Sequence, residues 1–404
     1  MARLRTEISW QHAAVRCALY HPWVYLRGGA ERVLLEISGR SAHDWTIFTH
    51  SFQPHATFPE LSSLDVAELR PAVSVRRSIA PLAGAAAVIA ASRLPDIGAG
   101  ALLVSSEGLG DFVLARNRLP AVAYCHTPLK ILHDPVTRAR LAGQSPAKAA
   151  LQSALGPGFA TADRRLWRRY RHAFANSEEV RRRLERAGLV PRGPVEVLHP
   201  GVDLERFPPG DGGRRRDRVF LVPGRIMWQK NVELAIDAFR QARGQGLDAE
   251  LVVAGAVDDK SRSYLSTLRD LAAGLPVAFE TDVSDERLVE LLSSCLAVVH
   301  PSPSEDFGIT PLEAMAAGAP VLAVDAGGTR ESVVDGETGW LVPADLGRFA
   351  SALVSAAEAA RAGGLEPMRA AARRRAAQFG WEPFVARIDE VMERVAAESR
   401  AAAG

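Results

Sequence analysis

Two glutamates, Glu305 and Glu313, stand with seven residues between them where a short apolar strand gives way to a helix. We predict that Thr310 is the N-cap of that helix, because Pro311 follows it and Glu313 comes three residues after it. The free backbone N–H groups and the dipole of a helix start attract an anion. The two carboxylates could accept hydrogen bonds from sugar hydroxyls. The alternative is that Glu313 only closes a capping box.

A second pair of candidates, Arg225 and Lys230, follows another apolar strand that ends near Gly224. Two cations five residues apart at the carboxyl end of a strand could clamp one diphosphate, with the arginine bidentate and the lysine a point charge. Exposed cations in loops usually bind nothing, which is the alternative. However, only four of the 49 basic residues are lysines, so a lysine in this chain is not the default cation.

The first half of the chain offers weaker candidates. Gly28 and Gly29 follow a strand and open a helix, where glycines let the backbone approach a ligand, although a tight turn is the alternative. His126 ends another strand, and a lone histidine is more often structural than catalytic. His126 and His133 could pair as metal ligands, but no third ligand is near in the sequence, so we predict no metal site.

Taken together, these segments resemble the family-4 glycosyltransferases. Glu305 and Glu313, followed by Ala-Met-Ala-Ala-Gly-Ala-Pro-Val, are similar to the E-x(7)-E motif of that family. Arg225 and Lys230 resemble its glycine-arginine…lysine element. The Gly-Gly-Ala-Glu tetrapeptide at Gly28 resembles its first loop. The resemblance covers residues from about 16 to 345 and is more specific in the second half than in the first.

The resemblance implies a GT-B fold of the α/β class, in which two Rossmann-like, doubly wound parallel-sheet domains face a central cleft. It also implies a retaining transferase that moves a sugar from a nucleoside diphosphate sugar, UDP or GDP, to an acceptor hydroxyl. No metal ion or other cofactor is expected, because protein cations would stabilise charge on the departing β-phosphate.

The roles of the site residues follow from the same resemblance. It implies that Glu305 contacts the donor sugar, that Glu313 binds the ribose hydroxyls and that His126 supports the reacting sugar. Arg225 and Lys230 would stabilise the leaving diphosphate. The diphosphate and sugar would be held by backbone groups at Gly224, Phe307, Gly308, Ile309 and Thr310, with Gly28 and Gly29 close by.

The acceptor side is less defined. If the fold is right, Trp23, Tyr25, Arg27 and Glu107 would line it. A small molecule and a lipid-linked compound both stay open as acceptors. The family often has glycine where Glu280 stands, in a loop that lines the base pocket, so the choice between a uridine and a guanosine nucleotide also stays open.

The elements that must position these residues follow from the sequence pattern. Short apolar runs alternate with helical patterns, which indicates parallel α/β sheets. We predict six strands in the first half, at Arg16–Tyr20, Trp45–Thr49, Ala101–Ser105, Ala121–Cys125, His172–Ala175 and Val195–Leu198. We predict six in the second, at Val219–Val222, Glu250–Ala254, Val277–Phe279, Ala297–His300, Val321–Val324 and Gly339–Val342.

These elements suggest two domains of similar size. We expect an acceptor-binding domain over residues 1–200 and a nucleotide-sugar-binding domain over residues 201–380, with a run of Pro, Gly and Asp at 208–213 as part of the linker. Residues 381–404 read as a helix that either stays on the second domain or crosses back to the first. Ligands of open α/β sheets bind beyond the carboxyl ends of the strands, so a site between two such sheets is expected.

Composition limits the partners and the compartment. A formal net charge of +2 gives no global attraction to nucleic acid. Three widely spaced cysteines and no apolar run long enough for a signal peptide or a membrane span favour the cytoplasm. Residues 163–188 hold nine arginines and four acids, which form either a solvated helix face or a docking surface for anionic lipid on the inner face of the membrane, or for a phosphorylated acceptor.

Two rival functions fit the same architecture. A nucleotide-sugar epimerase would act on the donor without an acceptor, and a non-catalytic protein would only bind the sugar nucleotide. Intact Arg225, Lys230, Glu305 and Glu313 argue against a decayed site. Asp306-Phe307-Gly308 spells a kinase motif without the catalytic loop that should precede it, so a kinase is not expected.

Overall fold

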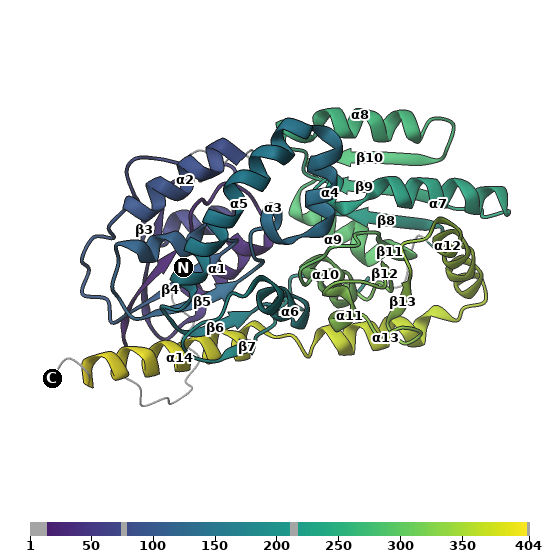
Figure 1. The fold of residues 1–404 in the computed structure, drawn as a ribbon. Helices are drawn as coiled ribbons and strands as arrows, with labels where there is room; N and C mark the ends of the chain where they lie inside the picture. The colour runs from purple at the N-terminus through teal and green to yellow at the C-terminus, as the bar shows by residue number, and fades with distance from the viewer. Residues whose placement is uncertain (1–13, 74–78, 211–216, 402–404) are drawn as a thin grey trace.

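Two parallel sheets, one in each half of the chain, organise the computed structural model, which describes residues 14–73, 79–210 and 217–401 (Figure 1). The first sheet has the strand order β3-β2-β1-β4-β5-β6-β7 and the second has the order β10-β9-β8-β11-β12-β13. Every pairing within them is parallel. The α/β class and the pair of doubly wound sheets are as predicted.

The first domain contains the first sheet and the helices around it, with the bounds β1 (Arg16–Tyr20), α1 (Gly29–Arg40), β2 (Asp44–Thr49), η1 (Pro59–Ser63), β3 (Val66–Glu68), α2 (Ile79–Ala91), β4 (Ala101–Ser106), η2 (Gly110–Ala115), β5 (Ala121–Cys125), α3 (Lys130–His133), α4 (Pro135–Gln144), α5 (Pro146–Trp167), β6 (Tyr170–Ala175), α6 (Glu178–Ala187) and β7 (Val195–Val197). The second domain contains β8 (Val219–Pro223), η3 (Trp228–Lys230), α7 (Val232–Gly244), β9 (Glu250–Gly255), η4 (Asp259–Ser261), α8 (Arg262–Leu271), β10 (Val277–Thr281), α9 (Asp285–Ser294), β11 (Ala297–His300), α10 (Ile309–Ala316), β12 (Val321–Val324), α11 (Thr329–Ser332), β13 (Gly339–Val342), α12 (Leu346–Arg361) and α13 (Leu365–Ala376). The last helix is α14 (Trp381–Ala401).

The central strands are buried along almost their whole length. Residues 219–223 and 121–125, for example, have no exposed side chain, because helices cover both faces of a doubly wound sheet. Such strands read as continuous apolar runs, which is why all twelve predicted strands are found. The strand that the prediction missed is β3, which has three residues, none of them buried.

The strand order decides where ligands can bind. In both sheets the chain winds outward in one direction and then returns to start again on the other side, between β1 and β4 and between β8 and β11. Ligands of open α/β sheets bind at the carboxyl ends of strands next to such a switch point. The loops after β1, β4, β8 and β11 are therefore the places to look for a site.

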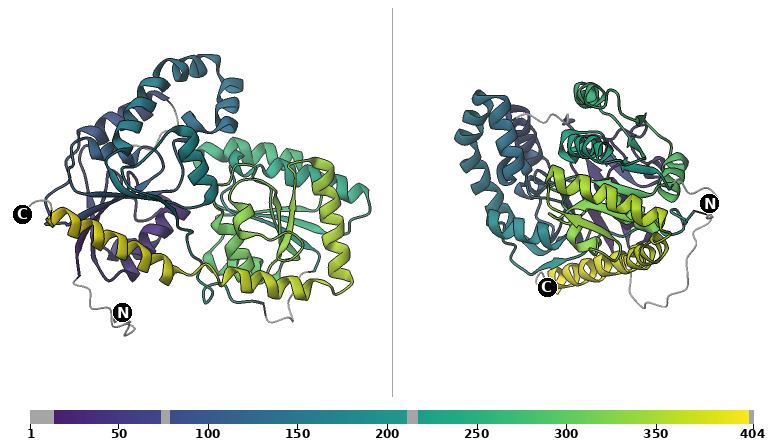
Figure 2. Two further views of the ribbon diagram at one scale, coloured as in Figure 1. Left: turned by 60° about the horizontal axis from the view of Figure 1, so that its bottom comes forward. Right: turned by 90° about the vertical axis from the view of Figure 1, so that its right-hand side faces the viewer.

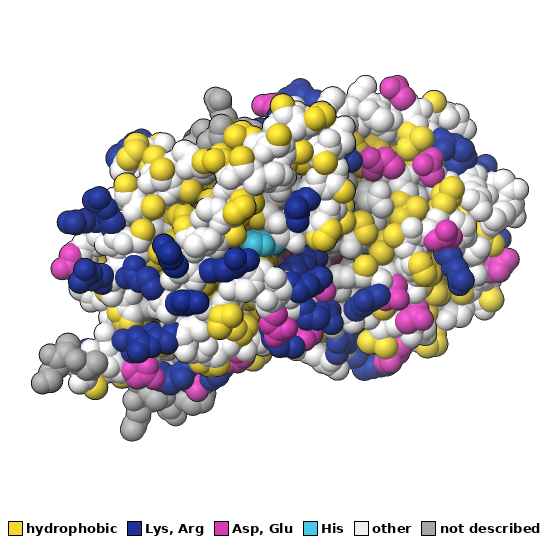
Figure 3. Space-filling view, viewed as in Figure 1, with side chains coloured by type: hydrophobic (Ala, Val, Ile, Leu, Met, Phe, Trp, Pro, Cys, Tyr) yellow, Lys and Arg dark blue, Asp and Glu magenta, His cyan; other side chains and the backbone are white. Residues whose placement is uncertain are grey.

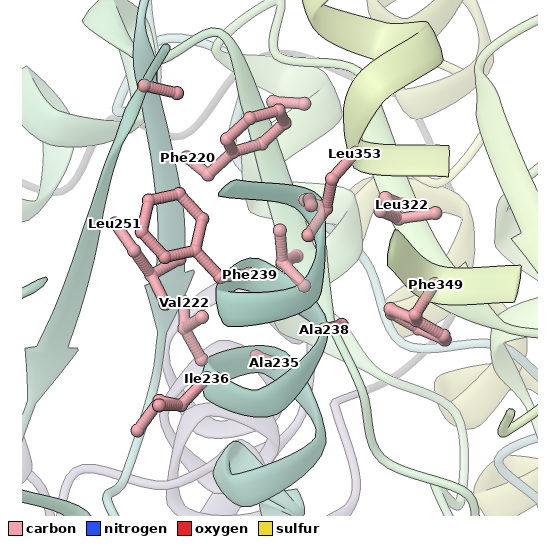
Figure 4. Packing of buried hydrophobic residues seen from close by; sticks show 14 of the residues in the cluster. Phe220, Val222, Ala235, Ile236, Ala238, Phe239, Leu251, Leu322, Phe349 and Leu353 are labelled. Atoms are coloured by element: carbon pink, nitrogen blue, oxygen red, sulfur yellow. The ribbon is translucent and has the colours of Figure 1, made fainter. Parts of the chain in front are cut away.

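Helix packing holds those loop-bearing strands in place. In the second domain, α7 lies between the sheet and α12, and Phe239 of α7, Phe220 of the sheet and Leu353 of α12 are buried in one cluster (Figure 4). Fully burying one such side chain stabilises the fold by about 1.5–3 kcal/mol. This cluster fixes β8 and the loop that follows it.

The chain crosses between the domains a second time near its end. After α13, helix α14 lies along the first domain (Figure 2), where Trp381 and Phe384 are buried in the same cluster as Tyr124 of β5. Arg387 of α14 also forms a bidentate ion pair with Glu196 of β7, with both distances 2.8 Å. Part of the predicted linker run 208–213 lies outside the described residues.

Three further observations concern the whole described chain. All three cysteines are buried and free. No helix in the described ranges is long and apolar enough to cross a membrane. In the region of high arginine content, seven of the nine arginines have acidic or carbonyl partners, namely Arg164, Arg169, Arg171, Arg181, Arg182, Arg183 and Arg186. A lipid-docking role for residues 163–188 stays a prediction.

Candidate functional site

A cavity of about 380 Å³, which we call the cleft, lies between the two domains. Its walls come from the loops after β1, β4 and β5 and from helices α2 and α4 in the first domain, and from the loops after β8 and β11 in the second. Both switch points of the fold therefore contribute to one site. Six of the predicted site residues line it: Trp23, Tyr25, Glu107, Arg225, Lys230 and Glu305.

Glu305 keeps its negative charge in a largely buried position. Its Oε2 atom lies 2.8 Å from Nζ of Lys230 and 3.0 Å from Nε2 of His300. Burial raises the pKa of the Glu305 carboxyl, but Lys230 and His300 outweigh it and hold that pKa well below its usual range. The structure thus joins the predicted loops after β8 and β11 by a direct ion pair.

The start of α10 differs from the prediction. The helix begins at Ile309 and its N-cap is Gly308, with φ at 93°, so Thr310 is the second helical residue and not the N-cap. The left-handed backbone that precedes the helix requires glycine, which displaces the side-chain cap expected at Thr310. No side chain caps the start of α10, so its first backbone N–H groups follow directly after Gly308.

Glu313 does not form the capping box that the sequence left open. No hydrogen bond or ion pair to a described residue is found for its carboxylate, and a capping box would need one to the N-cap N–H. Desolvation, with Asp285 adding to it against Arg206 and Lys230, raises the pKa of Glu313 to about 7. A partly buried carboxylate without a partner is suited to accept hydrogen bonds from a ligand.

Close backbone approaches bring the other predicted donor residues together. A Cβ atom on Gly29 would lie 3.1 Å from Cδ1 of Ile309, so the first loop touches the start of α10 in the other domain. A Cβ on Gly224 would lie 3.9 Å from the Thr310 hydroxyl. Phe307 is buried against the rings of His199 and Phe379, so only its backbone is available to a ligand.

Arg225 is the unengaged cation of the cleft. It lines the cavity, and no ion pair or hydrogen bond joins its guanidinium to a described residue. Arg225 attracts the carboxylate of Glu31 on α1, which would contact any Cβ added to Gly28. Burial and the nearby Glu107 raise the pKa of Glu31 to about 8, against the attraction of Arg225. Arg225 is thus left available for an anionic ligand.

His126 and Arg27 are two further predicted residues that lie outside the lining of the cleft. His126 is nearly buried, and its Nε2 lies 2.8 Å from the Ser105 hydroxyl. Burial and the neighbouring His21 lower the pKa of His126 to about 3, so the ring is neutral at physiological pH. Arg27 reaches across to the second domain instead, with its guanidinium 3.6 Å from Asp285 at the start of α9.

A group of polar residues that sequence reasoning missed bridges the two domains beside the cleft, and we call it the Asp306 cluster. Asp306 of the second domain lies 2.7 Å from Nζ of Lys130 and 2.5 Å from Nη1 of Arg183, both in the first domain. Its carbonyl accepts a 2.5 Å hydrogen bond from the Ser177 hydroxyl. Ser304 also donates to Asp134 at 3.0 Å.

A second bridge lies nearby. The carboxylate of Glu331 accepts hydrogen bonds from the backbone N–H groups of Glu178 and Glu179, at 2.7 and 3.0 Å, and lies 2.8 Å from His199. An acid from the second domain therefore caps α6 of the first domain, where the helix dipole favours negative charge. The scarcity of lysine was a signal for Lys130, but nothing local in the sequence predicted that Asp306 and Glu331 would bridge the two domains.

Within the described ranges, no group of three or more His, Cys, Asp or Glu side chains is placed to hold a metal ion. The cations that face the cleft are protein side chains, among them Arg225, Lys230 and Lys130. Two carboxylates, the backbone N–H groups at the start of α10 and an arginine without a partner in the described part of the chain can together bind an anionic ligand that also carries hydroxyl groups.

Comparisons with known proteins agree with this geometry. The family model for "Glycosyltransferase Family 4" matches residues 27–206, and the model for "Glycosyl transferases group 1" matches residues 207–375. The D-inositol 3-phosphate glycosyltransferase of Kribbella flavida is 35% identical over 316 residues, which cover 72% of this chain and 69% of that protein. Its counterpart in Geodermatophilus obscurus is 33% identical over 323 residues, which cover 72% of this chain but only 66% of that protein.

Two solved structures share the arrangement of both domains. Sucrose-phosphate synthase from Thermosynechococcus elongatus has a TM-score of 0.72 at 20% sequence identity, and the match covers 95% of this chain and 100% of that chain. The Anabaena protein HepE, in complex with UDP and glucose, has a TM-score of 0.68 at 19% identity, covering 94% of this chain and 99% of that chain. These likenesses confirm the predicted GT-B fold.

Proposed function

The chain belongs to the family-4 glycosyltransferases, and from that membership we propose that it moves a sugar from a nucleoside diphosphate sugar to an acceptor hydroxyl. We further propose that the transfer retains the anomeric configuration and needs no metal ion. The observation that carries the proposal is the meeting of Arg225, Lys230, Glu305 and the start of α10 at the switch point of the second sheet.

The charges of the site support a metal-independent mechanism. A helix start supplies about half an elementary positive charge, which is less than a diphosphate requires. Arg225 faces the cleft without a partner among the residues that the structure describes, and it can take both terminal oxygens of a phosphate in bidentate fashion. Lys230 lines the same cleft as that arginine and contacts Glu305, so it can share its protons between the carboxylate and a phosphate. Together these groups would stabilise charge on the departing β-phosphate.

The carboxylates divide the remaining tasks. Glu305, held ionised by Lys230 and His300, would accept hydrogen bonds from hydroxyls of the donor sugar. Glu313, without a protein partner in the described chain, would accept them from the ribose hydroxyls. His126 would support the reacting sugar as a neutral ring, because its pKa lies far below physiological pH. None of these side chains needs to act as a covalent nucleophile in this proposal.

The donor is proposed to be a UDP-sugar in the first instance. HepE, which shares the fold, was crystallised with UDP and glucose, and this suggests the nucleotide to test first. The relatives' names point to D-inositol 3-phosphate as an acceptor to try. Glu280, which stands where the family often has glycine near the base, forms a bidentate ion pair with Arg287 at 2.8 and 2.9 Å. Because the sequence at this loop differs from the usual one, a guanosine nucleotide belongs in the same panel.

Calorimetric titration with UDP, GDP, UDP-glucose and GDP-mannose tests the donor site directly. We expect one of the two nucleotide series to bind, and binding to be lost in Arg225→Ala. Transfer in the presence of a chelator tests metal independence, and NMR of the product's anomeric signal tests retention. Activity that vanishes on chelation and returns with magnesium or manganese would contradict the metal-independent mechanism. Donor turnover to an altered free sugar nucleotide, without acceptor, would indicate an epimerase instead.

A further inference from the structure

The two halves of the cleft differ in chemistry. The half that belongs to the donor site is polar, with Arg225, Lys230 and Glu305. The opposite wall comes from α2, from α4 and from the segment around α3. It carries five aliphatic side chains, Leu82, Ala85, Leu129, Ile131 and Leu141, alongside Lys130, Thr137 and Arg140. A polar acceptor such as a free sugar would leave this wall facing water or unpaired hydroxyls.

The aliphatic wall continues beyond the cleft into a second, smaller hollow of about 40 Å³, which we call the annex. Leu82, Leu129 and Ile131 line both spaces, so the annex and the cleft adjoin. The annex is otherwise lined by Ala83, Leu132, Gln152, Leu155, Gly156 and Phe159. Its one polar side chain, Gln152, donates through its amide nitrogen to the carbonyl of Ile131 and leaves the surface apolar.

The outer surface above the annex is unusually apolar as well. Helix α2 has no polar or charged residue between Ile79 and Ala91, although a surface helix normally carries a polar face. Six large hydrophobic side chains are exposed in the described chain, and three of them, Val136, Leu151 and Leu155, lie on α4 and α5. Figure 3 shows hydrophobic side chains gathered over the region of α2 and α5.

The cations on this side of the cleft already have partners. Lys130 forms its ion pair with Asp306 at 2.7 Å, and the guanidinium of Arg140 stacks over the ring of Trp228 at 4.5 Å from its centroid. A phosphorylated polyol, like the one in the relatives' names, would have to displace these contacts. An apolar chain would displace only water from the aliphatic wall and the annex, which is favourable.

We propose that the acceptor is an amphiphile, with its reactive hydroxyl at the donor site and an apolar chain along the wall of α2 and into the annex. The chain is an acyl, alkyl or isoprenoid group. The inference rests on the proposed transfer reaction, because that reaction puts the acceptor on the first-domain side of the cleft. Continuity between the cleft and the annex through three shared leucine and isoleucine side chains is the observation that carries it.

The test measures how binding depends on chain length. Methyl, butyl, hexyl and octyl β-D-glucosides are titrated into the UDP-saturated protein by calorimetry, all below micelle-forming concentrations. We expect the affinity to rise by up to about fourfold per methylene, the value for a fully buried CH₂ group, and to level off when the annex is full. D-inositol 3-phosphate is titrated in parallel.

Two variants locate the chain. Leu155→Asp puts a charge at the rim of the annex at an already exposed position, and Gly156→Leu fills the hollow, since a Cβ there would lie 3.4 Å from Leu132. Both should flatten the dependence on chain length without changing UDP affinity. Leu346→Asp, at an exposed leucine of the second domain, is the matched control and should keep the wild-type dependence.

The outcomes separate this inference from the proposed function. The amphiphilic acceptor is overturned by any of three results. These are a wild-type affinity that does not change with chain length, a dependence on chain length that persists in both variants, and tighter binding of D-inositol 3-phosphate than of the glucosides. In each of those cases, intact UDP binding leaves the transferase proposal standing. Loss of all nucleotide binding would instead remove the transferase proposal, and the inference with it.

Discussion

Charge compensation around Glu305 is the central fact at the scale of single residues. A carboxylate with about 15% of its side chain exposed would ordinarily take up a proton, but Lys230 and His300 both contact one of its oxygens. His300 has its own pKa lowered by burial, so the positive charge comes chiefly from Lys230. Lys230 therefore neutralises the carboxylate of Glu305 in the free protein and is placed to bind a phosphate when a donor binds.

Lys230→Ala tests that double role. We expect turnover to fall by about 10²- to 10³-fold, which corresponds to about 2.7–4 kcal/mol for the loss of one fixed donor to a developing charge. The fold should persist, because His300 still contacts Glu305. Steady-state kinetics and thermal unfolding measure the two effects. Lys148→Ala, at an exposed lysine on α5, is the control, and unchanged turnover in Lys230→Ala would refute the assigned role.

Glu313 gives the site a dependence on pH. Its pKa is raised to about 7 by burial, so the carboxyl is mostly protonated below that pH and mostly ionised above it. Two ribose hydroxyls donate best to the ionised form, so donor affinity should weaken as the pH falls through 7, by at most tenfold per unit for one proton.

Calorimetry with UDP-glucose from pH 5.5 to 8.5 measures this linkage, because its diphosphate has no group that titrates in this range. Glu313→Gln should bind more weakly than the wild type at pH 8.5 and should no longer lose affinity as the pH falls. Glu31, whose pKa is about 8, loses its charge on acidification, and this acts in the opposite direction by favouring an anion near Arg225. A wild-type affinity that is constant over the range, or a slope that persists in Glu313→Gln, would assign the ribose contact to another group.

Sequence reasoning identified individual residues where local pattern and chemistry coincide. Arg225, Lys230 and Glu305 follow apolar strands, and the structure brings them into one cleft. The roles of these residues stay predictions. Lys130 and Asp306 were missed because their chemistry depends on contact between segments more than 170 residues apart, which no local pattern encodes.

At the scale of elements, each end of α10 has a glycine with a left-handed backbone, and the two glycines differ in what surrounds them. Gly308 is its N-cap with φ at 93°, and Gly318 follows its last turn with φ at 80°. Both angles strain any other residue. Only at Gly308 would an added Cβ crowd the site, at 3.2 Å from Cγ of Glu305, whereas at Gly318 the nearest atom is 3.8 Å away.

That contrast gives a matched pair of variants. Gly308→Ala and Gly318→Ala should each destabilise the protein by about 1–2 kcal/mol, the cost of a left-handed non-glycine residue. Only Gly308→Ala should also weaken nucleotide binding, because it moves the first N–H groups of α10 and the Glu305 side chain. Chemical unfolding and calorimetry measure the two quantities. Equal loss of nucleotide affinity in both variants would show that the helix start has no special role.

The same helix illustrates what sequence can and cannot specify. Its existence follows from the pattern after Gly308, and its predicted start was wrong by two residues because Thr310 looked like the better cap. The strands were easier, since their apolar runs are set by burial on both faces. The short edge strand β3 lacks such a run, and only its pairing with β2 defines it.

At the scale of the whole molecule, the donor loop is held from both domains. The donor loop, residues 302–308, belongs to the second domain, yet its Asp306 forms ion pairs with Lys130 and Arg183 of the first domain. These three side chains are 12–28% exposed, so water screens their attraction only in part. Separation of the domains would remove both cations and release the residue next to Glu305. Closure and correct placement of Glu305 are therefore expected to occur together.

Asp306→Asn tests this coupling, because it keeps the shape and one acceptor while removing the charge that holds two cations. Hydrogen bonds to charged groups contribute about 1.5–3 kcal/mol, so we expect donor KM to rise and kcat to fall, each by about tenfold. Small-angle scattering of the UDP-bound protein should give a larger radius of gyration than the wild type. Asp325→Asn removes a comparable 2.6 Å ion pair with Arg330 inside one domain and should change neither quantity. If Asp306→Asn matches Asp325→Asn in kinetics and in radius, the bridge is only a surface contact and the donor loop is positioned by the second domain alone.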